Sequence, residues 1–122
     1  MNSFAFSISM PPSVNAMFAT DFRTKRRFMS KEYSAWRNGE SRAVHEAWVK
    51  AGKPKFERPV ALTIHLGLNY KSDIDNRVKP ILDLLDKSIP NFPNDRYIDR
   101  LTVERHRDIY GARVLIMQGA GE

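Results

Sequence analysis

Two aspartates, Asp73 and Asp75, stand two positions apart in a run that reads Asp-Ile-Asp-Asn-Arg-Val-Lys. In an extended segment, residues i and i+2 point to the same side, so the sequence predicts that the two carboxylates are presented together. Grouped carboxylates repel one another unless a proton, a basic side chain or a cation joins them. Their hard oxygen atoms suit Mg²⁺ or Mn²⁺, and we interpret this segment as a candidate metal site.

Two further residues extend this candidate site. Asp95 lies 20 residues after Asp75, beyond an expected helix and a loop, and it joins the site only if that loop folds back along the helix. Asp99 is a rival third ligand and is less favoured, because it leads into an expected strand. Lys79 follows Asp75 by four residues, so the two lie on the same side if both are helical. Its ammonium group is suited to neutralising charge that develops on a phosphate.

The same aspartates have simpler interpretations. An Asp-x-Asp pair ahead of a helix is often only an N-terminal cap that interacts with the helix dipole. A calcium loop does not fit, since Arg77 and Val78 occupy its third ligand and glycine positions. Asp83 and Asp86 are assigned to the solvated face of the next helix. Three scattered histidines are interpreted as surface or packing residues: His45, His65 and His106.

Basic side chains are concentrated in the first half of the chain. The net charge is +6, and residues 21–58 hold 11 Lys and Arg against 5 Asp and Glu, whereas residues 59–122 hold 9 of each. This asymmetry fits a polyanion-binding half joined to a cation-binding half. The most basic stretch, here called the basic loop, contains Arg23, Lys25, Arg26 and Arg27. We predict that it contacts phosphates, and an ordinary solvated loop is the alternative.

Aromatic residues are interleaved with the basic loop. They are Phe18, Phe22 and Phe28. Exposed rings in such a setting stack on open bases or wedge between them, whereas burial against a sheet is an equally good interpretation of the sequence. The aromatic residues therefore leave two interpretations open.

Periodicity predicts the elements that position these residues. In chain order they are a strand at 4–8, a helix at about 31–51, a strand at 60–68, a helix at about 78–89, and strands around 101–103 and 114–117. Ser30 is the expected N-cap of the first helix, and Pro80 requires the second helix to start close to Val78. Residues 11–29 lack periodicity, so we expect a long, mobile surface loop. Gly111 is expected to turn a hairpin between the last two strands.

This order, β-α-β-α-β-β, predicts an α+β (mixed α/β) domain with a small sheet of about four strands and two main helices. We expect residues 1–122 to form a single domain. The absence of cysteine excludes a disulfide framework and a thiolate metal site, which is compatible with a cytoplasmic location. No apolar run approaches the roughly 18 residues of a membrane span, so no membrane partner is expected.

Three segments of the sequence resemble the RusA family of Holliday-junction resolvases. They are Pro11-Pro12-Ser13-Val14-Asn15, Asp73-Ile74-Asp75-Asn76-Arg77-Val78-Lys79 and Asn94-Asp95-Arg96-Tyr97-Ile98. Their order, their spacing and the length of the chain all fit, and the resemblance spans nearly the whole sequence. The second segment is fairly specific, the proline segment supports it, and the third is weak by itself.

The resemblance implies a small homodimeric endonuclease, encoded by a bacterium or a phage, that uses Mg²⁺ to nick two symmetrical strands of a four-way DNA junction. By motif match, Asp73, Asp75 and Asp95 are the acidic residues and Lys79 is the essential lysine. Family members often have two adjacent aspartates at the third site, whereas Asn94 precedes Asp95 here. This departure replaces a carboxylate beside Asp95 with an amide and leaves Asp99 as the alternative contributor, and Pro80 after the lysine is a second departure from the family pattern.

We therefore predict a structure-selective endodeoxyribonuclease that resolves Holliday junctions by paired nicks in DNA recombination and repair. Water is the expected nucleophile, Mg²⁺ (or Mn²⁺) the cofactor, and the products carry 5′-phosphate and 3′-hydroxyl ends. DNA contacts are expected from the basic loop together with Asn15 and Arg77. Three alternatives stay open: a non-catalytic module that binds branched DNA, a flap or single-strand nuclease, and a protein-interaction domain whose basic loop is incidental.

Overall fold

A computed structural model describes residues 2–57, 59–68, 73–93 and 98–118 of the chain. Its elements are β1 (Ser3–Ile8), the 3-10 turn η1 (Val14–Ala16), β2 (Phe18–Thr20), β3 (Arg27–Met29), α1 (Lys31–Lys50), β4 (Val60–Leu66), the 3-10 turn η2 (Ile74–Arg77), α2 (Val78–Ser88), β5 (Ile98–Arg105) and β6 (Ala112–Gln118). The predicted fold class is confirmed, because two helices accompany a four-stranded sheet and a separate two-stranded sheet. Within the described ranges, neither helix has the length and apolar character that a membrane crossing requires.

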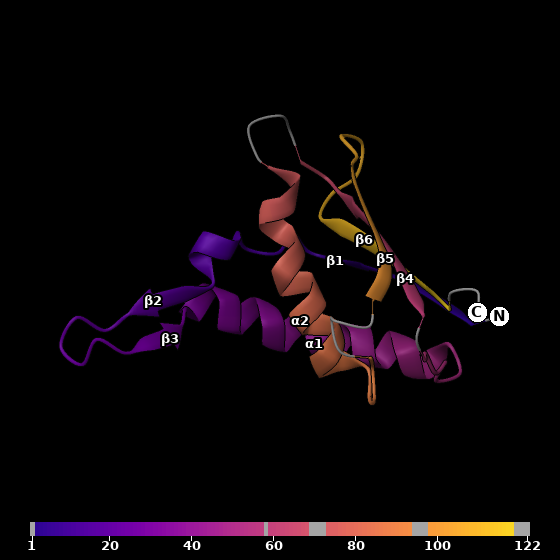
Figure 1. Cartoon of the computed structure of the whole chain (residues 1–122), viewed down its shortest axis with the longest axis horizontal. Helices are drawn as coiled ribbons and strands as arrows, with labels where there is room; N and C mark the ends of the chain where they lie inside the picture. Colours follow the sequence, from indigo (N-terminus) through magenta and orange to yellow (C-terminus); the bar gives the residue numbers. More distant parts are fainter. Residues whose placement is uncertain (1, 58, 69–72, 94–97, 119–122) are drawn as a thin grey trace.

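The four-stranded sheet has the order β1-β6-β4-β5, and both helices cover one of its faces (Figure 1). β4 is parallel to β5 and antiparallel to β6, and β6 is antiparallel to β1. Alternate residues of β1, β4 and β6 are buried against Val44 and Trp48 of α1 and Ile81, Leu84 and Leu85 of α2. The intervening residues lie on the other face, which no described helix covers.

α1 has the start and the end that the sequence predicts. The Ser30 hydroxyl accepts a hydrogen bond of 3.1 Å from the backbone nitrogen of Tyr33, so Ser30 satisfies one of the free donors of the first turn. The helix ends before Gly52, whose φ of +93° is a conformation that favours glycine. Both boundaries of α1 are therefore set by the residues that flank it.

The expected hairpin between the last two strands is wrong. β5 pairs only with β4 among the described strands, and β6 lies between β1 and β4, so β4 separates β5 from β6. The connection between them crosses the end of β4 instead. It passes so close that a Cβ atom on Gly67 would lie 2.3 Å from the Ile109 carbonyl oxygen. The turn itself was predicted correctly at Gly111, which has a φ of +72°.

Residues 11–29 are also more ordered than the sequence predicts. After η1, β2 and β3 form an antiparallel ribbon in which Phe18 pairs with Met29 and Thr20 with Arg27. Figure 1 shows this ribbon as an arm at the left, beyond the start of α1 and away from the four-stranded sheet. Strands of three residues are too short to show a period of two, which explains why the pattern indicated a loop.

Candidate active site and nucleic-acid interface

Asp73 and Asp75 lie on η2, immediately before α2. Asp73 is the N-cap of this 3-10 turn and has extended backbone angles, whereas Asp75 is inside the turn, so the expected extended arrangement of the pair is wrong. Pro80 has no N–H group with which to continue α-helical hydrogen bonding back to Asn76, and this favours a tighter turn ahead of α2.

Both carboxylates are exposed, and neither forms a hydrogen bond or ion pair with any described residue. In particular, the Asp73 side chain does not bond to the turn that it precedes. The simple capping interpretation therefore does not describe what this side chain does. Two exposed carboxylates on one short turn, with no bonding partner among the described residues, are available to bind a cation.

The proline segment lies beside η2, although more than 60 residues separate them in sequence. Arg77 donates through Nη1 to the carbonyl oxygen of Pro11 over 2.6 Å, and the separation in sequence is 66 positions. Pro11 and Pro12 are buried, and η1 contacts both η2 and α2. The guanidinium predicted to contact DNA is thus half-buried against backbone, and its Nε atom is buried without a hydrogen-bond partner among the described residues.

Lys79 is bound to a residue that the sequence analysis placed on a solvated face. Its Nζ atom lies 3.2 Å from Oδ1 of Asp83, one turn further along α2. The side chain of Asp83 is 29% exposed, so it is not simply solvated, and that interpretation is corrected. The signal was present in the sequence, because oppositely charged residues at i and i+4 are neighbours on a helix.

Asp83 also connects Lys79 to the first helix. The hydroxyl of Tyr33, a residue only 2% exposed, interacts with the Asp83 carboxylate. Burial raises the pKa of the Tyr33 hydroxyl, and the negative charge of Asp83 raises it further. Tyr33 therefore stays neutral and can act as a donor, which fixes the carboxylate that pairs with Lys79.

The third predicted acidic residue, Asp95, lies outside the described residues. Asp99, its rival, is the second residue of β5 and is exposed. Ile98 begins β5 and pairs with Val60 at the start of β4, whereas Asp73 follows the end of β4. Asp99 and the Asp73–Asp75 turn therefore come from opposite ends of the β4–β5 strand pair.

The basic loop forms the tip of the β2–β3 ribbon. Asp21 shapes this tip, because its carbonyl oxygen accepts from the Lys25 nitrogen (2.6 Å) and its carboxylate accepts from the Arg23 nitrogen (2.9 Å). All four basic residues are exposed, and only Arg27 has an aromatic partner, with its guanidinium carbon 4.3 Å from the centre of the Phe18 ring. Three cationic side chains at the tip are thus available to phosphates.

The three phenylalanines have different environments. Phe18 packs edge-on against Tyr33 and is 37% exposed, and Phe28 is 49% exposed. Phe22 lies at the tip and is 93% exposed. Burial against the sheet, one of the two interpretations left open, therefore does not apply to Phe22, whose whole ring is available for stacking. Asn15, another expected DNA contact, is exposed on η1.

Histidines that are distant in sequence come together in the structure. Among the described residues, the one group of three side chains with ligand atoms close enough to share a metal ion is His65, Glu104 and His106. The interpretation of these histidines as scattered is therefore wrong for two of the three. The parallel pairing of β4 with β5 brings them together, and that pairing is not visible in the local sequence pattern.

The chain was also compared with known proteins. No curated protein matches its sequence. A family model described as endodeoxyribonuclease RusA matches residues 9–117, a range that contains η1, the basic loop, η2 and α2. The match covers most of the 122 residues. The proline segment and the Asp73–Lys79 segment, which meet through Arg77, are therefore parts of one family pattern, and the chain belongs to the RusA endodeoxyribonuclease family.

Proposed function

We propose that this chain is a Mg²⁺-dependent, structure-selective endodeoxyribonuclease that resolves Holliday junctions by paired nicks in DNA recombination and repair. Family membership supports the nuclease class and branched DNA as the partner. The observation that carries the proposal is the exposed carboxylates of Asp73 and Asp75, which have no bonding partner among the described residues, on a turn that leads directly to Lys79.

The donor set of this turn fits a hard divalent cation. Asp73 and Asp75 offer oxygen ligands that no described cationic side chain neutralises. Asp95 is proposed as the third carboxylate, and Asp99 is not, because it comes from the opposite end of the β4–β5 strand pair. When bound, Mg²⁺ would supply charge neutralisation at the phosphate and activation of the attacking water molecule.

Lys79 is proposed to stabilise negative charge on the scissile phosphate. Its side chain is 54% exposed while its Nζ atom stays 3.2 Å from Asp83, so the ammonium group is both positioned and within reach of a ligand. Ammonium groups placed where charge develops lower the barrier to phosphodiester cleavage. Asp83 and Tyr33 act here as positioning residues, because the Asp83 carboxylate pairs with the Lys79 ammonium group and interacts with the Tyr33 hydroxyl.

The β2–β3 ribbon is proposed as the DNA-binding arm. Its tip carries Arg23, Lys25 and Arg26, and a projecting arm can follow a phosphate backbone that the sheet itself does not reach (Figure 1). Phe22 at the same tip can stack on base faces that are exposed where a junction crossover interrupts the helical stack. A continuous duplex exposes no such base face, which gives the arm a preference for branched DNA.

A homodimer is proposed because one chain supplies a single Asp73–Asp75 turn. A four-way junction presents two equivalent strands related by a two-fold axis, and paired nicking needs two equivalent sites. Two-fold symmetric dimers are the commonest soluble oligomers, and such a dimer places its two copies of a site in the same symmetry as the junction.

The decisive experiment compares three proteins on a labelled four-way junction with Mg²⁺. Wild type is expected to release nicked duplexes with 5′-phosphate ends, whereas Asp75→Asn is expected to bind the junction without cutting it. Asp108→Asn is the matched control, because it removes the same charge from an exposed turn between β5 and β6. It should cut as wild type does.

The alternatives give different results in the same assay. Binding by wild type without cleavage in either Mg²⁺ or Mn²⁺ would identify a branched-DNA-binding module. Equal cleavage of linear duplex, flap and junction would identify a general nuclease. Unchanged junction affinity after substitution of the basic loop would identify an incidental loop and remove the proposed DNA-binding arm.

A further inference from the structure

Two histidines and a glutamate meet where β4 and β5 end, on the face of the sheet that no described helix covers. His65 and Glu104 are paired in the parallel register of these strands, so their side chains emerge side by side. His106 follows β5, and its backbone nitrogen donates to the Leu66 carbonyl oxygen over 2.8 Å. All three side chains are therefore carried by hydrogen-bonded backbone.

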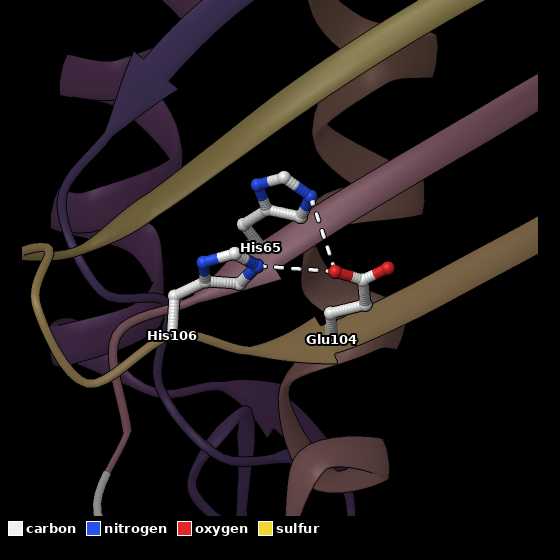
Figure 2. A group of neighbouring side chains, drawn as sticks. All are labelled: His65, Glu104 and His106. Atoms are coloured by element: carbon white, nitrogen blue, oxygen red, sulfur yellow. Dashed lines mark hydrogen bonds and ion pairs between the residues drawn. The ribbon is translucent and has the colours of Figure 1, made fainter.

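The side chains converge on one point. Figure 2 shows both imidazole rings with a nitrogen directed at the same carboxylate oxygen of Glu104. That oxygen lies 3.1 Å from Nε2 of His106 and 3.7 Å from Nε2 of His65, and the two rings are stacked with centroids 4.0 Å apart. The three ligand atoms all lie within 4.8 Å of one another.

These separations are close to those of a coordinated ion. With bonds of about 2.0–2.1 Å, two ligand atoms of a tetrahedral zinc centre are about 3.4 Å apart. The distances from Glu104 to the two histidines lie on either side of that value, and the histidine nitrogens lie within 4.8 Å of each other, so side-chain rotations would bring all three ligands to one ion. Exposed fractions of 27% for His65, 33% for His106 and 53% for Glu104 leave a path for an ion to enter from solvent.

We propose that His65, Glu104 and His106 form a transition-metal site of the Zn²⁺ class, separate from the Asp73–Asp75 turn. Two imidazole nitrogens and one carboxylate oxygen are a ligand set that zinc accepts, with a fourth position left for water or an outside ligand. Imidazole suits zinc, cobalt and nickel, whereas Mg²⁺ prefers oxygen ligands, so the two sites select different ions.

The surrounding charge strengthens this selection. Arg113 on β6 is the register partner of His65 and lies on the same face of the sheet, where its positive charge opposes any cation. A weakly held hard ion does not overcome such repulsion, whereas a metal that forms strong bonds to imidazole does.

Bound metal would join β4 to β5, which is an edge strand of the sheet, and would stabilise the folded chain by mass action.

The test is titration of the purified full-length protein with Co²⁺, a spectroscopic substitute for Zn²⁺, and thermal unfolding with Zn²⁺. The expected results are visible absorption that saturates at one Co²⁺ per chain and a melting temperature raised by Zn²⁺. Glu104→Gln and His106→Gln should each weaken Co²⁺ binding by more than about 100-fold, since even outer-shell partners contribute about 10- to 100-fold.

Two controls separate this site from others. Asp75→Asn should bind Co²⁺ with wild-type affinity, as measured by the visible absorption of the bound ion. His45→Gln, which removes an exposed histidine elsewhere, should do the same. Arg113→Gln keeps all three ligands and should tighten binding several-fold, so it tests the site even if a ligand variant does not fold. Absence of Co²⁺ absorption in wild type and in Arg113→Gln, or binding that is unchanged in both ligand variants, overturns the proposal.

Discussion

Arg77 donates a hydrogen bond of 2.6 Å to the backbone carbonyl oxygen of Pro11, and this bond joins the proline segment to the turn that carries Asp73 and Asp75. Both prolines of that segment are buried, so a water molecule cannot easily take the place of Arg77 as the hydrogen-bond donor to this carbonyl oxygen. The guanidinium group of Arg77 therefore helps to position the candidate active site relative to η1, together with the packing of η1 against η2 and α2.

Replacement of Arg77 by methionine is expected to destabilise the protein. The bond from a charged donor contributes about 1.5–3 kcal/mol, and its loss leaves a buried carbonyl oxygen without this partner. Urea unfolding should show a lower midpoint with an unchanged slope. Arg77→Lys is the control, because it keeps the charge while it lacks the planar guanidinium, and it should recover only part of the loss. Equal midpoints for wild type and methionine variant would contradict the structural role.

Replacement of Asp83 by asparagine should affect cleavage more than stability. A partly exposed ion pair such as Lys79–Asp83, with a lysine that is 54% exposed, contributes about 0–1 kcal/mol, so unfolding should change little. Misplacement of Lys79 should nevertheless slow junction cleavage about 10- to 100-fold, as expected when a catalytic group loses its position. The measurement is single-turnover cleavage beside junction affinity, which should not fall. A cleavage rate equal to that of wild type would mean that Lys79 acts without help from Asp83.

Tyr33 should give the folded protein a specific alkaline instability. Its pKa is raised above the ordinary value of 10.0 by burial and by Asp83, so the folded state holds the phenolic proton more tightly than the unfolded state does. This contribution is complete below about pH 10 and is lost as the pH rises through the folded-state pKa. Melting temperatures of wild type and Tyr33→Phe should therefore converge above about pH 10. A constant difference across that range would contradict the assignment.

Neutralising the tip of the DNA-binding arm should change the salt dependence of DNA binding. We expect the triple substitution of Arg23, Lys25 and Arg26 by glutamine to reduce the slope of log affinity against log salt by about 0.9 for each phosphate that the arm no longer neutralises. Glutamine at position 25 adds no backbone strain beyond what Lys25 already has at its φ of +58°. The control removes three exposed cations outside the arm, namely Arg42, Lys50 and Lys55. If both triple variants reduce the slope equally, the arm has no special role.

The sequence predicted the elements that have a strong internal period. The alternation around β4 and the apolar stripe of α2 are local patterns, and Ser30 and Pro80 marked the helix starts correctly. These features depend on neighbouring residues, so they can be identified without knowledge of the fold.

The features that could not be predicted depend on the pairing of residues that are distant in sequence. The insertion of β6 between β1 and β4 replaced the expected hairpin, and the parallel register of His65 with Glu104 produced a side-chain cluster that no spacing indicated. Asp83 is an intermediate case. Its pairing with Lys79 was visible at i and i+4, whereas the approach of Tyr33 from α1 required the packing of the two helices.

The proposed nuclease chemistry depends on a divalent cation at the Asp73–Asp75 turn. The direct measurement is anomalous diffraction from crystals soaked in Mn²⁺, which replaces Mg²⁺ at hard oxygen sites. We predict an anomalous peak about 2.1 Å from a carboxylate oxygen of each aspartate, and no such peak in Asp75→Asn. A map with no peak at this turn, or with Mn²⁺ only at other residues, would contradict the proposed nuclease site.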